Sequence, residues 1–86
     1  MRFYDEILYK LGLPPDQAVG RKVLLVDDRA VFVEGHRGLT VLSDEEIRFR
    51  YGRQDLVVRG RELKLTELSP DEGYVVGKIV GVAYEK

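Results

Sequence analysis

The residues of this 86-residue chain that could do chemistry are a group of carboxylates and one histidine. Carboxylates in clusters can bind calcium or supply a general acid and base, and those near the first turns are Asp27, Asp28, Glu34, Asp44, Glu45 and Glu46. Their spacing matches no calcium-binding loop, and acidic residues are common at loop tips. We therefore interpret them as turn residues.

The single histidine, His36, has the side chain of a general base. Its surroundings, Gly35-His36-Arg37-Gly38, predict an exposed turn. The chain has no cysteine. Its two serines, Ser43 and Ser69, each lie in a Leu-Ser-x-x-Glu segment. We expect each serine to cap one turn by accepting a backbone N–H. No nucleophile and base can thus be paired, and we predict no catalytic residue, no metal site and no cofactor.

Arginine is concentrated between residues 47 and 61, where five arginines and one acid, Asp55, give a local charge of +4. The segment Ile47 to Tyr51 alternates apolar and cationic residues, which predicts a strand with one buried face. Arg48 and Arg50 then share the exposed face, and Arg59 joins them if the next strand pairs as a hairpin.

Three interpretations of this arginine face remain open. It is a solubilising strand face that hinders edge pairing, a contact for an acidic protein or anionic lipid, or a surface for phosphate or single-stranded RNA. The net charge of the chain is −1, which excludes a generally cationic nucleic-acid binder. We do not expect nucleic acid as the partner.

Residues 2–12 are predicted to form an amphipathic helix. Its apolar residues fall on one stripe, namely Phe3, Tyr4, Ile7, Leu8 and Leu11. Gly12 suits the end of the helix, and Pro14 and Pro15 prevent its continuation. A helix this short is marginal alone, so it packs on its own domain or docks on another chain. This stripe and the arginine face, Arg48, Arg50 and Arg59, are the candidate partner-binding residues.

Short strand patterns separated by turns occupy the rest of the chain. The expected strands cover residues 23–26, 31–33, 39–42, 47–51, 56–59, 63–66 and 74–84, with a turn at Gly60-Arg61 and bulges or a bend at Gly77 and Gly81. We expect one domain over 1–86: a helix and Pro-containing connector over 1–20, then an antiparallel all-β domain over 21–86, a small sandwich or barrel. The predicted core is Ile47, Phe49, Leu56, Val58, Leu63, Leu65, Ile79 and Val82.

The sequence has no apolar run longer than four residues, and the acids Asp5 and Glu6 stand near its start, where a signal peptide has bases. A transmembrane helix needs about 20 apolar residues, and a signal peptide needs a core of about 7–15. We therefore expect an unexported, cytoplasmic protein without a transmembrane segment.

A set of turn and core residues in this chain resembles the YabP/YqfC family of sporulation proteins of endospore-forming bacteria. The resemblance is carried by the turn Glu34 to Gly38, Leu39 to Leu42, Ser43-Asp44-Glu45-Glu46-Ile47-Arg48, Val58-x-Gly60, Leu63-x-Leu65, Leu68-x-Pro70-x-Glu72 and Gly77-x-Ile79-x-Gly81-Val82-x-Tyr84. The segment Leu11-Gly12-Leu13-Pro14 is similar to the YqfC branch in particular. Tyr74-Val75-Val76 is less polar than the family pattern, so the resemblance does not fix the strand register there.

The resemblance implies a protein made in the mother cell and encoded beside membrane sporulation proteins, the YqfD type for the YqfC branch. It also implies an immunoglobulin-like β-sandwich, with no enzymatic activity and no cofactor. Our leading hypothesis is a non-enzymatic adaptor that contacts a membrane sporulation partner, peripherally at a membrane, or a second copy of itself as a homo-oligomer. The alternative is a small barrel that binds nucleic acid through the arginine face.

Overall fold

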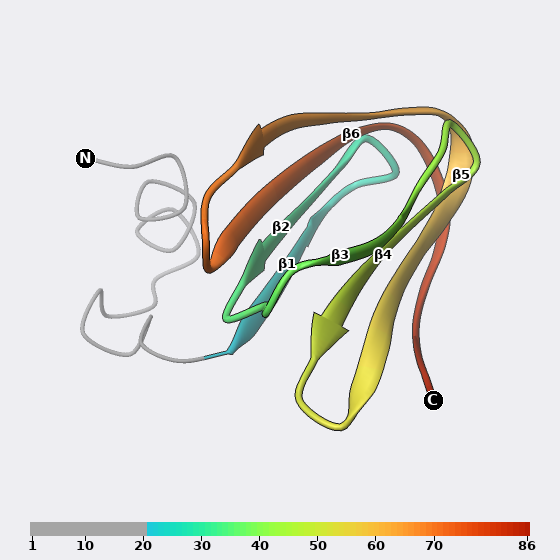
Figure 1. Ribbon diagram of the computed structural model, residues 1–86. Coiled ribbons are helices and arrows are strands. Elements are labelled where there is room, and N and C mark those ends of the chain that lie inside the picture. Colours follow the sequence, from blue (N-terminus) through green and yellow to red (C-terminus); the bar gives the residue numbers. More distant parts are fainter. Residues whose placement is uncertain (1–20) are drawn as a thin grey trace.

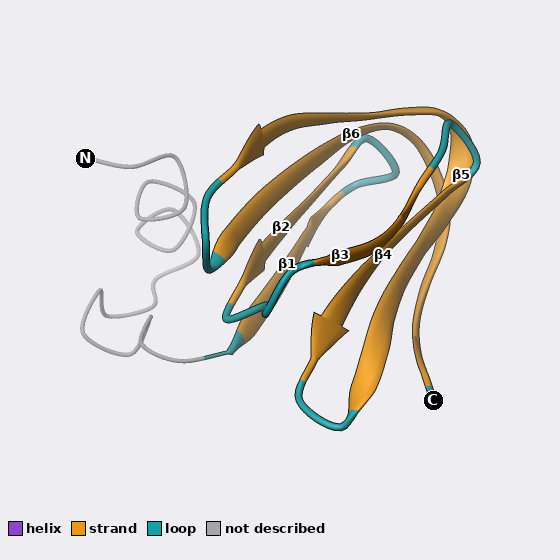
Figure 2. Cartoon of the chain, viewed as in Figure 1, coloured by secondary structure: helices purple, strands orange, loops and turns teal. Residues whose placement is uncertain are grey.

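The computed structural model describes residues 21–86, and these residues form six strands and no helix (Figure 2). The strands are β1 (Lys22–Val26), β2 (Ala30–Glu34), β3 (Leu39–Leu42), β4 (Glu46–Tyr51), β5 (Gln54–Leu68) and β6 (Glu72–Glu85). The prediction of an antiparallel all-β domain is confirmed. The helix expected over residues 2–12, with its apolar stripe, lies outside the described residues.

The six strands belong to one sheet with the order β1-β2-β6-β5-β4-β3, and every neighbouring pair is antiparallel. β5 and β6 form the centre of the sheet, and β1 and β3 are its edges. The more specific expectation of an immunoglobulin-like sandwich or a barrel stays a prediction.

The turn predicted at Gly60-Arg61 is wrong, because the chain does not reverse there. The segments expected as two strands, 56–59 and 63–66, are parts of the single strand β5. The pairing of β5 with β6 shifts register three times, between Arg59 and Gly60, between Arg61 and Lys64, and between Leu65 and Glu67. Bulges of this kind bend a strand and increase its twist. Gly60-Arg61 therefore marks a bend within β5 rather than a turn between two strands.

The bend requires two residues without side chains on the facing strands. A Cβ added at Gly60 would overlap the backbone carbonyl oxygen of Lys78. Gly77 has a φ of 141°, and an added Cβ would lie 2.7 Å from the carbonyl oxygen of Glu62. The expected bend at Gly77 is thus confirmed. β5 and β6 arch together over the rest of the sheet at this point (Figure 1).

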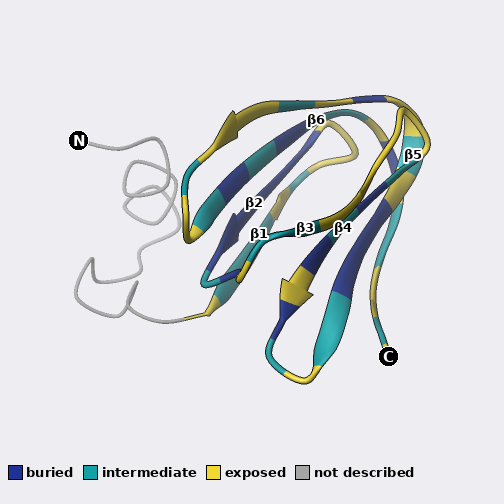
Figure 3. Ribbon diagram, viewed as in Figure 1, coloured by how far each residue is buried: buried dark blue, intermediate teal, exposed yellow. Residues whose placement is uncertain are grey.

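The arch lets strands that are not sheet neighbours share one core. Only the first part of β6 pairs with β2, and only the first part of β5 pairs with β4. The buried cluster nevertheless joins side chains of both, and Figure 3 shows buried positions along β2 and β4. Its members are Val31, Val33, Ile47, Phe49, Tyr51, Leu56, Val58, Leu63, Val75 and Ile79.

The predicted core is largely confirmed. Six of its eight residues are buried, whereas Leu65 and Val82 are half-buried and pack against the cluster. The valines of β2 and Val75 are also buried. They were not predicted, because their short apolar runs lack a clear alternation. The capping prediction is also confirmed, because Ser43 Oγ accepts the Glu46 N–H at 2.9 Å and Ser69 Oγ accepts the Glu72 N–H at 3.0 Å.

Replacing Gly60 by alanine should destabilise the protein by about 1–3 kcal/mol or more, because the added methyl group meets backbone rather than a movable side chain. Gly81 is the matched control, since nothing lies within 4 Å of a Cβ added there. Gly81→Ala should be neutral or slightly stabilising. Chemical denaturation measures both, and equal effects of the two substitutions would contradict this account of the bend.

Ile47→Ala should lower the free energy of unfolding by about 2–5 kcal/mol, because the Ile47 side chain is fully buried. Val80 is 71% exposed, so Val80→Ala should change stability by less than about 0.5 kcal/mol. Thermal unfolding of Ile47→Ala tests which face of β4 is buried, and Val80→Ala in β6 is the control at an exposed site. Near-wild-type melting of Ile47→Ala would show that the assignment is inverted.

Candidate functional site

The arginine face predicted from the sequence exists, but its charges are paired. The strand pairing of β4, β5 and β6 brings Arg48, Arg50 and Arg59 together with three carboxylates, those of Glu46, Asp55 and Glu85. Arg59 Nη1 lies 2.6 Å from Glu85 Oε2, and its Nε lies 3.1 Å from Glu46 Oε1.

Arg48 is the most enclosed arginine of this network. Its Nε donates to Asp55 Oδ2 at 3.2 Å, and its Nη1 lies 3.5 Å from Glu85 Oε1. Arg50 is more exposed and reaches Asp55 Oδ1 at 3.5 Å. Three guanidinium groups therefore face three carboxylates, and the network carries no net charge. We call these six side chains the ion-pair network.

The ion pairs explain the pKa shifts of Glu85 and Arg59 in the network. The hydrogen bond from Arg59 lowers the pKa of the Glu85 carboxyl, and the positive charges of Arg59 and Arg48 act in the same direction. The hydrogen bond to Glu85 is also the largest cause that raises the pKa of Arg59. Glu46 and Glu85, which lie outside the counted segment, thus offset two of the four net positive charges counted along the sequence.

The prediction that His36 is exposed in its turn is wrong. Its side chain is 4% exposed, and its ring centroid lies 5.1 Å from that of Phe49. Nδ1 lies 2.9 Å from the backbone nitrogen of Gly38, and Nε2 lies 2.9 Å from the carbonyl oxygen of Glu72. The Gly38 N–H therefore donates to Nδ1, and Nε2–H donates to Glu72. The ring links the 35–38 turn to the start of β6.

The carboxylates near the first turns do not converge on one site. Asp28 pairs with Lys78 at 2.5 Å, and this contact lowers the pKa of the Asp28 carboxyl. Glu46 belongs to the ion-pair network, and Glu34 is buried at the end of β2. Over residues 21–86 no group of three His, Cys, Asp or Glu side chains is arranged to hold a metal ion.

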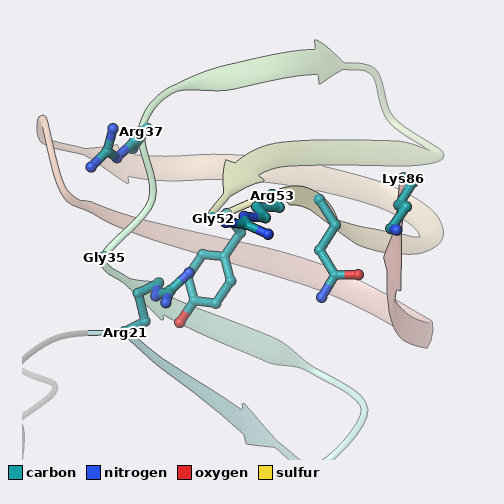
Figure 4. A pocket seen from close by; sticks show the side chains of 8 residues that line it. Arg21, Gly35, Arg37, Gly52, Arg53 and Lys86 are labelled. Atoms are coloured by element: carbon teal, nitrogen blue, oxygen red, sulfur yellow. The ribbon is translucent and has the colours of Figure 1, made fainter.

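A pocket that the sequence analysis missed lies at one end of the folded sheet (Figure 4). It has a volume of about 830 Å³ and is bounded by the 35–38 turn, the turn between β4 and β5, and the ends of β1 and β6. Its lining residues are Arg21, Gly35, Arg37, Tyr51, Gly52, Arg53, Gln54 and Lys86. The cationic residues lie far apart in the sequence, so no spacing pattern could reveal them.

Comparisons with known proteins identify a family. The model of the YabP family matches residues 17–86. The uncharacterised protein YqfC of Bacillus subtilis (strain 168) is 27% identical over 75 residues, which cover 86% of this chain and 81% of YqfC. No solved structure matches the chain. Within the described part, no helix has the length and apolarity needed to cross a membrane.

Glu85 should make stability depend on pH in acid. Its pKa is lower in the folded than in the unfolded state, so its contribution is complete above the unfolded value of about 4.5. That contribution is lost as the pH falls through the folded value. The difference in unfolding free energy between wild type and Glu85→Gln should thus be present at neutral pH and disappear in acid. Denaturant titrations at a series of pH values measure it.

Glu67→Gln is the matched control, because Glu67 is exposed and outside the ion-pair network. Its effect should be small at every pH. High salt should shrink the Glu85 effect, since the pair is partly exposed and screened by ions. A Glu85→Gln effect that is constant from neutral pH to about pH 3 would show that the Arg59 pair adds no stability.

Proposed function

We propose a function from the premise that this protein belongs to the YabP family: it acts in endospore formation as a non-enzymatic adaptor. In this role a compact β domain provides surfaces for protein–protein contact and carries out no reaction. The family is one of sporulation proteins, and membership implies a sporulation-related role. The adaptor activity is our proposal.

The observation that carries the proposal is the extent of the family match. It spans residues 17–86 and so includes all six strands. The property shared by the family therefore resides in the β domain, and the surface of that domain is where a common partner would bind. The stripe of residues 3–11 lies before the match and is a second contact in this proposal.

Two features of the described residues support a role without catalysis. Both ring nitrogens of His36 are engaged by backbone groups, so the ring offers no free nitrogen as a general base. Two of the six candidate carboxylates are engaged in ion pairs: Asp28 pairs with Lys78, and Glu46 binds arginine in the ion-pair network.

The partner that we propose is a membrane sporulation protein of the YqfD type, or a second copy of this chain. The outer face of β4 and β5 suits such a contact, because its arginines are held in fixed positions by carboxylates. A charged surface that is ordered before binding loses little side-chain entropy when a partner binds. In this proposal the protein acts in the mother-cell cytoplasm, peripherally at a membrane.

The alternative of nucleic-acid binding through Arg48, Arg50 and Arg59 receives no support from their geometry. Binding to nucleic acid depends on cations that replace counterions on phosphates. Here each arginine already faces a carboxylate, and the network is neutral. Oligonucleotide binding that weakens steeply with salt and is lost in Arg48→Gln with Arg50→Gln would favour this alternative.

Co-purification with the proposed partner, the membrane sporulation protein of the YqfD type, tests the adaptor proposal. The triple variant Leu8→Asp, Arg48→Glu, Arg50→Glu should lose the partner, since it disrupts both proposed surfaces. The matched control is Leu68→Asp, Arg61→Glu, Lys64→Glu, which makes the same charge changes at exposed residues of β5. Retained binding by the first variant would exclude the proposed surfaces.

Folding and copy number need separate controls in this experiment. Circular dichroism and thermal melting show whether a lost interaction reflects unfolding, because charge reversal leaves Asp55 and Glu85 facing acids. Light scattering distinguishes a self-contact from a partner contact. A dimer that the triple variant converts to a monomer would identify the second copy as the occupant.

A further inference from the structure

The pocket at the end of the folded sheet contains an arginine whose position is fixed by two glycines. Gly35 and Gly52 have φ values of 93° and 71°, in the left-handed region that favours glycine. A Cβ added at Gly35 would lie 2.5 Å from Arg21 Cγ, and one added at Gly52 would overlap the Arg21 guanidinium. The Arg21 side chain therefore occupies the space that these glycines leave open.

The ring of Tyr51 lies against the Arg21 guanidinium in the pocket. The guanidinium Cζ lies 5.9 Å from the centroid of the Tyr51 ring, within the range of a cation–π interaction. Tyr51 is 7% exposed, and its hydroxyl donates to the carbonyl oxygen of Glu34 at 3.1 Å. The cation thus rests on a ring that is itself fixed by the core and by a hydrogen bond.

The pocket concentrates cations in a chain whose net charge is −1. Arg21, Arg37, Arg53 and Lys86 line it, and none of the described residues lining it is acidic. In Figure 4 the side chains of Arg21 and Arg53 lie between those of Arg37 and Lys86. No described carboxylate lies within ion-pair distance of these four side chains, in contrast to the arginines of the ion-pair network.

We propose that this pocket binds an anion that carries phosphoryl groups. Guanidinium groups match phosphate oxygens in geometry and remain charged at all physiological pH values. The volume of about 830 Å³ lies in the range of small-molecule sites and exceeds what one phosphate ion requires. The Gln54 amide supplies a neutral donor and acceptor at the same wall. The inference is independent of the adaptor role.

Calorimetric titration of the full chain with inorganic pyrophosphate tests the site. The wild type should bind saturably, and Arg21→Gln with Arg53→Gln should weaken binding at least about tenfold, because each lost charge-assisted bond weakens affinity severalfold. The matched control is Arg61→Gln with Lys64→Gln, two exposed cations away from the pocket. It should bind within about twofold of the wild type. Absence of saturable binding, or equal losses in both double variants, would overturn the proposal.

A second pair of variants tests the positioning of Arg21 without removing any charge. Gly52→Ala inserts a methyl group where the guanidinium lies, whereas Gly38→Ala inserts one at a φ of 127° into open space. Both strain the backbone, but only Gly52→Ala should weaken pyrophosphate binding severalfold. Equal binding by the two variants would show that the glycine-fixed position of Arg21 is irrelevant. Arg53→Gln alone gives a further readout if the double variant does not fold.

Sedimentation with lipid vesicles distinguishes the two sources of such an anion. If the protein binds vesicles of phosphatidylcholine with phosphatidylglycerol, but not phosphatidylcholine alone, and pyrophosphate displaces it, the ligand is a lipid headgroup. If pyrophosphate binds in the pocket and the vesicles do not, the ligand is a free phosphorylated molecule. Either result supports the proposed site. If the protein binds neither pyrophosphate nor the vesicles, the site is excluded. If pyrophosphate does not bind but the protein still co-purifies with its partner, the site is excluded and the adaptor role is unaffected.

Discussion

The bend shared by β5 and β6 is the constraint on which this fold depends. A six-stranded open sheet of 66 described residues has two faces and no helix from this segment to cover either of them. Bending the two central strands brings one face against itself, so that Val31 and Val33 of β2 meet the core residues of β4. The bend in turn needs Gly60 and Gly77, since the two strands approach too closely there for a side chain.

The same bend brings together the parts of the pocket. The 35–38 turn connects β2 to β3 and is bonded to β4, because the Arg37 N–H donates to the Arg50 carbonyl oxygen and the Arg50 N–H donates to that of Gly38, both at 2.8 Å. The bend adds Arg21, which precedes β1, to this end of the sheet beside Gly52. In a flat sheet with this strand order three strands would separate β1 from β4, and Arg21 would not reach Gly52. The architecture and the proposed site therefore have one physical cause.

Local patterns predicted the fold wherever the cause was local. The alternation from Ile47 to Tyr51 identified its buried face, and the capping serines were identified from four-residue segments. The failures involve contacts between distant residues. Gly60-Arg61 has the composition of a turn, but its place opposite Lys78 makes it a bulge. His36 lies between glycines that favour exposure, yet Phe49 and the Glu72 carbonyl group enclose it. Neither partner is close in sequence.

Charge shows most clearly why the candidate site was harder to predict than the fold. Counting along the chain marked Arg48, Arg50 and Arg59 as a cationic surface, but three carboxylates neutralise them in the fold, those of Glu46, Asp55 and Glu85. Arg21, Arg37 and Arg53 are scattered in the sequence, but the fold brings them to one pocket, where no described carboxylate pairs with them. The capacity of an arginine to bind an external anion depends on the acids that the fold places beside it. Strand register determines that placement: Asp55 lies opposite Arg50 across β4 and β5, and opposite Glu85 across β5 and β6.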